Sequence, residues 1–253
     1  MGQLDFLDPF LCTLFIYGSA FGIAYVLKKL MALALGKKYP SIQWWLAELI
    51  TSLQMCTIVF QNGIMLKAYG VYYGFGPAVF IVLSFASFIN QGYFTHILVH
   101  VENAYNGKNK WTTVIATFAA QFIGASWAIT AAAYTWYYAT GLFTTHRQIM
   151  DEMNPCKFNP IDFSLLFTVE LCSTALLRLI IGLSAKYNNA KLHRFTVPAT
   201  VSILLCNSLL TAGVGGLNPI TSYARLGVCP GWKNVEFLLI FFVGTTVGWI
   251  IGA

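Results

Sequence analysis

The stretch A-G-V-G-G-L-N-P-I-T-S-Y-A-R-L, residues 212–226, interrupts a chain of long apolar segments. Asn218 is a favourable helix N-cap, and Pro219 suits the first helical turn, where its missing N–H costs nothing. The glycines before Asn218 favour open backbone. Inside a membrane, such backbone is tolerated only where it is buried in protein or lines a water-filled cavity. The stretch therefore predicts a short helix that begins within the bilayer, beside a pore or a substrate site.

The composition places the chain in a membrane. Of its 253 residues, 57% are hydrophobic and only 9% are charged, and its mean hydropathy is +0.66, unlike a soluble domain. Segment 219–228 is too short to cross a bilayer and predicts a half-helix. Segment 10–27 follows an acidic N-terminus and predicts an extra span, with an interfacial helix as the alternative. The segments that approach the ~20 residues of a spanning helix are 10–27, 43–65, 77–100, 112–138, 163–184, 195–213 and 235–253.

The basic residues gather on one side of these expected spans. Nine of the fifteen Lys and Arg residues fall after the first, third and fifth segments. By the positive-inside rule these connections are cytosolic, and the acidic N-terminus lies on the lumenal or extracellular side. The net charge of +6 thus reflects topology and does not indicate a nucleic-acid partner.

Two glutamates indicate an internal repeat. Glu48 and Glu170 each precede a leucine and a Ser/Thr pair inside an apolar segment. Asn103 follows Glu48 by 55 residues, and Asn218 follows Glu170 by 48. Because three spans separate the copies, they have opposite orientations, which predicts an inverted repeat with two broken helices near the bilayer midplane. Asn103 and Asn218 are thus both pore candidates, with an ordinary loop asparagine as the alternative for Asn103.

Each carboxylate within a span needs a partner, because a charge in hydrocarbon is costly. We expect Glu48 and Glu170 to support the re-entrant loops by accepting hydrogen bonds from their backbone. The alternative is a protonated glutamate, or one paired elsewhere in the bundle. Arg178, also within a span, either pairs with a carboxylate or extends toward the cytosolic interface.

The first box resembles the aquaporin (major intrinsic protein) family. It reads H-I-L-V-H-V-E-N-A-Y and is similar to the family pattern H-x-S-G-x-H-x-N-P-A. His96, His100 and Asn103 match that pattern, whereas Ala104 and Tyr105 replace its proline and alanine.

Further motifs carry the same resemblance. The second box keeps Asn218 and Pro219, with Ile220 where alanine is usual, and A-Q-F-I-G-A at 120–125 is similar to the third-span motif A-Q-x-x-G-A. Cys229 lies nine residues after Ile220. This cysteine, the degenerate boxes and the extra N-terminal segment resemble the unorthodox, subcellular branch called superaquaporins.

The resemblance implies a fold and its organisation. The fold is an all-α integral membrane fold, an inverted repeat of six spanning helices plus two re-entrant half-helices, here with an extra N-terminal helix. Residues 1–40 would form that helix and a Lys-rich linker, and residues 41–253 the channel domain. Its half repeats would cover about 41–140 and 160–253.

The resemblance also implies the pore. Opposed half-helix N-termini and the two asparagines would pass neutral solutes and repel cations. By family spacing, an arginine that narrows the outer mouth is replaced by a threonine. The residues expected at the constriction are mostly small and uncharged, which favours glycerol or hydrogen peroxide as permeating solutes in addition to water. The expected constriction residues are Leu83, Cys206, Gly215, Thr221 and Arg225.

The cysteines and histidines carry no metal-binding pattern. Cys156 and Cys229 fall in expected lumenal loops, where a disulfide can persist, and we expect them to pair. The alternative is a free Cys229 packed beside the second half-helix. His96 and His100 are four residues apart and could share a metal on a helix, but the remaining histidines lie in distant loops, so we expect the pair instead to line or gate the cytosolic vestibule. No catalytic constellation is present, so we expect no metal, no cofactor and no enzyme activity.

The sequence therefore predicts a passive transmembrane channel for water and small neutral solutes. The alternatives are a degenerate channel fold with a mainly structural, organellar role, and a seven-span receptor-like protein, which the internal repeat disfavours. The resemblance further implies a homotetramer embedded in lipid. It implies an intracellular membrane, such as the endoplasmic reticulum, with the plasma membrane as the alternative.

Overall fold

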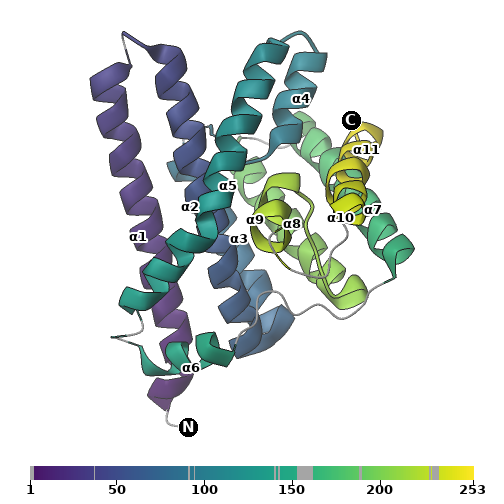
Figure 1. The fold of residues 1–253 in the computed structure, drawn as a ribbon. Helices are drawn as coiled ribbons and strands as arrows, with labels where there is room; N and C mark the ends of the chain where they lie inside the picture. The colour runs from purple at the N-terminus through teal and green to yellow at the C-terminus, as the bar shows by residue number, and fades with distance from the viewer. Residues whose placement is uncertain are drawn as a thin grey trace.

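The computed structural model describes residues 3–36, 38–90, 92–93, 95–139, 141, 143–152, 162–187, 190–227, 229 and 234–253. Within these ranges the regular elements are all helices, which confirms the predicted all-α membrane fold (Figure 1). The stretches long and apolar enough to cross a membrane are Leu7–Leu35, Pro40–Ile89, Trp111–Ala139, Phe163–Tyr187 and Leu192–Ala212, with a shorter apolar stretch at Val235–Ile251. The elements are α1 (Gln3–Leu35), α2 (Pro40–Gly70), η1 (Val71–Phe75), α3 (Gly76–Ile89), α4 (Ile97–Tyr105), α5 (Trp111–Ala139), α6 (Thr144–Glu152), α7 (Phe163–Tyr187), α8 (Ala190–Ala212), α9 (Pro219–Leu226), α10 (Asn234–Leu238), η2 (Leu239–Gly244) and α11 (Thr245–Ile251).

The long stretch Pro40–Ile89 reverses direction and supplies two antiparallel helices. The reversal occurs at Gly70, whose φ of 77° is readily adopted only by glycine. Lys28 of α1 shows the antiparallel pairing. Its Nζ donates to Oγ1 of Thr51 near the start of α2 (3.4 Å) and to Oδ1 of Asn90 just beyond α3 (3.1 Å). The end of α3 therefore lies level with the first part of α2.

Close glycine contacts recur in the two halves of the chain. A Cβ on Gly124 of α5 would lie 2.6 Å from the carbonyl oxygen of Leu49 in α2, and one on Gly248 of α11 would lie 2.3 Å from that of Leu171 in α7. Leu49 and Leu171 each follow one of the paired glutamates. Small residues let the helix backbones approach closely. Helices α2 and α5 thus pack in the first half as α7 and α11 pack in the second.

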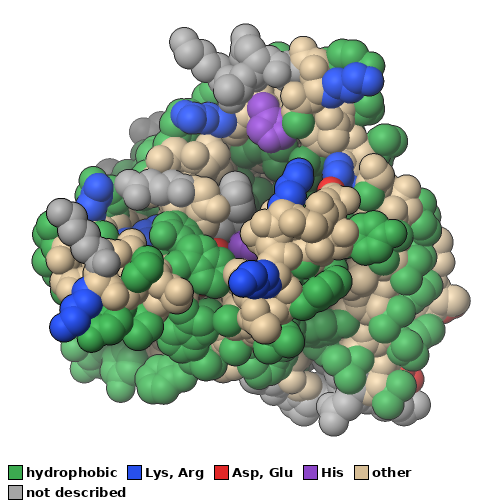
Figure 2. All heavy atoms as spheres, turned by 90° about the horizontal axis from the view of Figure 1, so that it is seen from above, with side chains coloured by type: hydrophobic (Ala, Val, Ile, Leu, Met, Phe, Trp, Pro, Cys, Tyr) green, Lys and Arg blue, Asp and Glu red, His purple; other side chains and the backbone are tan. Residues whose placement is uncertain are grey.

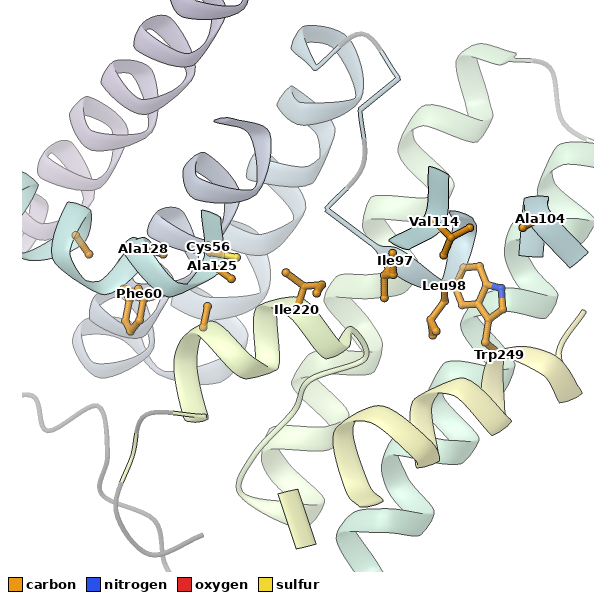
Figure 3. Close-up of a cluster of buried hydrophobic side chains, with 12 residues drawn as sticks. Cys56, Phe60, Ile97, Leu98, Ala104, Val114, Ala125, Ala128, Ile220 and Trp249 are labelled. Atoms are coloured by element: carbon orange, nitrogen blue, oxygen red, sulfur yellow. The ribbon is translucent and has the colours of Figure 1, made fainter. Parts of the chain in front are cut away.

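Two short helices, α4 and α9, begin inside the bundle. The predicted span 77–100 is wrong as a single element, because α3 ends at Ile89 and residues 97–100 belong to α4. His96 has extended backbone (φ −148°) and starts the new helix. Figure 3 shows that both short helices contribute to one apolar core shared with the long helices. The buried members of this core are Cys56, Phe60, Ile97, Leu98, Ala104, Val114, Ala125, Ala128, Ala132, Ile220, Ala224 and Trp249.

Helix α1 lies along the rest of the bundle as an added element. Tyr17 and Phe21 pack with Met55 and Ile58 of α2 and with Val82 of α3. With 33 residues, α1 is longer than the predicted segment 10–27. Its packing along α2 favours the expected extra span over the interfacial alternative.

The two chain ends lie at opposite ends of the bundle (Figure 1). The α1–α2 and α4–α5 connections lie at the same end as the C-terminus, whereas α6 lies near the N-terminus. We call the first end the basic side, because it carries the Lys-rich connections. Figure 2 views it from above and shows lysines and arginines spread over it among apolar side chains.

Candidate functional site

The second box begins a half-helix, as its sequence predicts. The N-cap of α9 is Asn218, whose Oδ1 accepts a hydrogen bond from the N–H of Ile220 (2.9 Å), and Pro219 is the first helical residue. Leu217 just before it has φ 56°, a left-handed conformation that is uncommon for a branched residue. Such a conformation persists only where its surroundings hold it in place.

Glu170 of α7 holds Leu217 in this conformation. Its Oε1 accepts the N–H of Gly216 (2.8 Å) and its Oε2 accepts the N–H of Leu217 (2.7 Å). The glutamate is fully buried, so both oxygens find partners in the loop rather than in water. The carboxylate therefore fixes the turn that presents Asn218.

The first half-helix begins at His96, so Asn103, predicted to be a pore asparagine like Asn218, does not cap its N-terminus. The N-cap of α4 is His96, and its first residue is Ile97. Asn103 lies in the last turn, where its carbonyl oxygen accepts hydrogen bonds from the N–H groups of Lys108 (2.8 Å) and Asn109 (3.2 Å). The physical reason is that the helix already starts at the first residue of the predicted box and ends at its last residue, Tyr105, so Asn103 comes too late to cap its N-terminus.

The other residues of the predicted first box also lie away from the helix start. Ala104 is buried in the shared core, and Tyr105 is 84% exposed at the end of α4. Ile220 of the second box is likewise a core residue with no exposed surface, so it packs against neighbouring helices instead of facing a pore.

The correct first box carries a signal that the sequence does contain. His96 follows Glu48 by 48 residues, and Asn218 follows Glu170 by 48. The inverted repeat thus pairs His96 with Asn218 and Ile97 with Pro219. Histidine is not among the favoured N-cap residues, so capping preference points instead to Asn103.

The two boxes meet. The Nδ2 of Asn218 donates a hydrogen bond to the carbonyl oxygen of Thr95, the residue before His96. The imidazole of His96 lies beside the backbone of Leu217 and packs on the ring of Trp249, with centroids 4.7 Å apart. The N-termini of α4 and α9 therefore converge, each with the partial positive charge of a helix start.

Glu48 has a different environment from Glu170. It is buried, and it accepts a hydrogen bond from Nε2 of Gln121 (3.0 Å). Its Oε1 lies 3.5 Å from Nε2 of His100, which is also buried. His100 is thus an interior group and His96 is partly buried, and their expected role in lining the vestibule stays a prediction. Because α4 begins at Ile97 and not after Asn103, the side chains of His96 and His100 both turn toward the inside of the bundle.

The comparisons with known proteins agree with this architecture. No family model matches the chain. The chain is 28% identical, over 254 residues, to a protein of Caenorhabditis elegans named "Putative aquaporin-10". The similarity covers 98% of this chain and 87% of that protein, so it includes both half-helices and α1.

The chain is thus similar to an aquaporin over almost its whole length.

An ion pair fixes the first half-helix. Nε of Arg178 in α7 donates to Oε2 of Glu102 (2.7 Å), and its Nη2 lies 2.5 Å from Oε1. Nε1 of Trp249 in α11 donates to Oε2 of the same carboxylate (2.8 Å). Of the alternatives for Arg178, the structure therefore shows pairing with a carboxylate. Because Trp249 also packs on His96, this cluster connects the end of α4 to its beginning.

The expected constriction residues lie on several elements of the chain. Leu83 packs against the apolar cluster that α1, α2 and α3 share. The thiol of Cys206 in α8 donates to the carbonyl oxygen of Val71 at 3.7 Å. Gly215 is packed so closely on α8 that a Cβ would lie 2.9 Å from that of Ser208.

The last two constriction residues lie on α9. Oγ1 of Thr221 donates to the carbonyl oxygen of Asn218 (3.3 Å), so Thr221 adds to the first turn of the half-helix. Arg225 lies one turn later, near enough to Glu170 for their charges to attract. Thr221 and Arg225 are thus the constriction candidates tied most directly to the second box.

The described cysteines fall into two groups, free and disulfide-bonded. In the part of the chain that the structure describes, no group of three His, Cys, Asp or Glu side chains could hold a metal ion. Cys12, Cys56, Cys172 and Cys206 are free, and Cys229 is disulfide-bonded. Cys156, its expected partner, lies outside the described residues, so the identity of the partner stays a prediction.

Proposed function

We propose that this protein is an aquaporin-like passive transmembrane channel for water and small neutral solutes. The observation that carries the proposal is the convergence of the two half-helix N-termini at Thr95, His96 and Asn218. Interrupted helices of this kind are tolerated within a membrane where they line a path for polar solutes.

Polar atoms without partners mark the same place. The hydroxyl oxygens of Thr95 and Ser222 are buried and have no hydrogen-bond partner among the described residues, and the buried ring nitrogens of His96 have no side-chain partner there. Buried polar atoms are nearly always hydrogen-bonded in proteins. A solute that carries its own donors and acceptors, such as water or a small polyol, can supply these bonds as it passes.

The charge at the junction favours neutral solutes. Two helix starts place partial positive charge at one point, which repels a cation that has lost part of its hydration shell. The side chains of Leu83, Cys206 and Thr221 bring no charge to the expected constriction. Glycerol and hydrogen peroxide are therefore proposed as solutes in addition to water.

Stopped-flow measurements on proteoliposomes test this function. We expect water, glycerol and hydrogen peroxide to cross faster than in empty liposomes. We expect His96→Leu to lower water flux about tenfold, because it removes polar contacts worth on the order of one hydrogen bond. Asn103→Ala, in the last turn of α4, is the control and leaves the flux unchanged.

Two results would contradict the proposal in different ways. Water flux with glycerol and peroxide fully excluded would remove the wider solute range but keep the channel. Flux no higher than in empty liposomes would favour a mainly structural role for the protein. The direct hydrogen bond between Asn218 and Thr95 is an observation that favours this alternative.

The assembly and organisation are part of the proposal. By resemblance we propose a homotetramer in an intracellular membrane, with residues 41–253 as the channel and residues 1–40 as an accessory element. Light scattering of the purified protein tests the tetramer, and imaging of the tagged protein in cells tests the membrane.

A further inference from the structure

A groove lies between α1 and α3, away from the half-helices. Its volume is about 670 Å³, within the range of small-molecule sites in proteins. Leu14 and Tyr25 of α1 and Phe85 and Phe88 of α3 are among its walls. All four are at least 42% exposed, so the groove is open along its length.

Two glycines form the floor of the groove on the α1 side. Gly18 and Gly22 are four residues apart and therefore lie on one face of the helix. A Cβ on either glycine would meet no atom within 4 Å. The backbone of α1 is thus open to close contact. Because α1 and α3 lie at membrane depth, the surroundings offer only acyl chains or another helix as occupants.

Two cations lie at the end of the groove nearer the basic side. Nζ of Lys29 lies 5.6 Å from the ring centroid of Tyr25, and the guanidinium of Arg194 lies 5.1 Å from that of Phe88. Both rings line the groove. Lys29 and Arg194 are exposed, and no carboxylate pairs with either among the described residues.

We propose that this groove binds an anionic phospholipid. One acyl chain lies on Gly18 and Gly22, and the headgroup phosphate is bound by Lys29 and Arg194. A second helix would fill the apolar part equally well, but it would leave both cations uncompensated. Juxtamembrane cations attract anionic lipids, and these two lie over Tyr25 and Phe88, which line the groove, so the charge at its end is complementary to such a headgroup.

Native mass spectrometry of the full chain in detergent tests the site. The probes are phosphatidylglycerol and phosphatidylcholine with identical acyl chains. We expect tighter binding of phosphatidylglycerol, and a loss of this preference by about fivefold for each of Lys29→Ala and Arg194→Ala. Gly18→Leu and Gly22→Leu, which fill the groove, are expected to weaken the binding of both lipids.

Matched controls separate the site from general lipid contact. Ala133→Leu places the same leucine side chain on an exposed face of α5, and Lys186→Ala removes a cation that lies over Tyr187. Both are expected to bind lipid as the unaltered chain does. If either leucine variant fails to fold, Gly18→Ala replaces it as the groove-filling variant, because it adds only one carbon at a position where no other atom lies nearby.

Three outcomes would overturn the proposal. They are equal binding of the two lipids by the unaltered chain, undiminished lipid binding by the groove-filling variants, and a dimer that Gly18→Leu dissociates. The last would identify a second copy of the chain as the occupant. None of these outcomes depends on whether the half-helices conduct solutes.

Discussion

Single carboxylates organise the site at the residue scale. Glu170 binds two consecutive backbone N–H groups and thereby holds Leu217 in its left-handed conformation. Glu48, its counterpart, instead accepts a hydrogen bond from the side chain of Gln121 and lies beside His100. The two halves thus share the position of the carboxylate but differ in what it supports.

Glu170→Gln tests this role directly. A glutamine has one acceptor oxygen, so one of the two buried N–H groups loses its partner, at a cost of about 1–3 kcal/mol. We expect a lower thermal midpoint in detergent and reduced solute flux. Asp151→Asn changes an exposed carboxylate that lies 3.9 Å from Arg147, and should have little effect. Equal midpoints for the two variants would show that Glu170 does not hold the loop.

The half-helix α4 depends on contacts with two other helices at the element scale. Glu102 accepts two hydrogen bonds from Arg178 of α7 and one from Trp249 of α11. Arg178 also lies over the Trp249 ring, 5.8 Å from its centroid. A helix of only nine residues is marginal by itself, so these contacts determine where α4 lies.

Arg178→Lys tests whether bidentate pairing is needed. Lysine keeps the charge but presents a single ammonium in place of the planar fork. We expect a loss of about 1.5–3 kcal/mol, the value of a hydrogen bond to a charged group, seen as a lower thermal midpoint. Glu102→Gln should cause a similar loss, and the double variant should lose less than the sum. Additive losses would show that the two residues act separately.

A buried polar network joins four helices at the scale of the whole molecule. Nε2 of Gln61 in α2 donates to Oγ1 of Thr13 in α1 (2.7 Å), and its Oε1 accepts Nε1–H of Trp136 in α5 (2.8 Å). Nε2 of His146 in α6 lies 3.3 Å from the same Oε1. Asp8 accepts the backbone N–H of His146 (3.1 Å). The network fastens the added helix α1 and the loop helix α6 to the channel.

The stability of this network should depend on pH. Burial lowers the pKa of His146 below its ordinary value of 6.5, and the nearby Asp8 offsets this only in part. The unfolded chain therefore binds more protons than the folded one as the pH falls through 6.5. The contribution to stability is complete above that pH and declines below it.

Thermal midpoints measured from about pH 7.5 to about pH 5.5 span the titration of an ordinary histidine. We expect the unaltered chain to lose stability toward the acidic end and His146→Gln to lose less. A variant with an unchanged pH profile would assign the effect to another group.

The sequence by itself determined the class of protein and the second half of the site. Hydrophobicity, the run of spans and the Asn218–Pro219 cap are local properties, because they depend on residues near one another in the chain. The equal spacing from Glu48 to His96 and from Glu170 to Asn218 is also present in the sequence. The stronger capping preference of Asn103, however, indicates a different residue as the start of the first half-helix.

Only the tertiary structure decided where the first half-helix begins and what holds it. His96 starts α4 while packed against Trp249 and the Leu217 backbone, which are more than a hundred residues away in sequence. The partner of Arg178 and the groove beside α1 depend in the same way on which distant helices come together. Local patterns do not encode these contacts, because they form only when the whole bundle is packed.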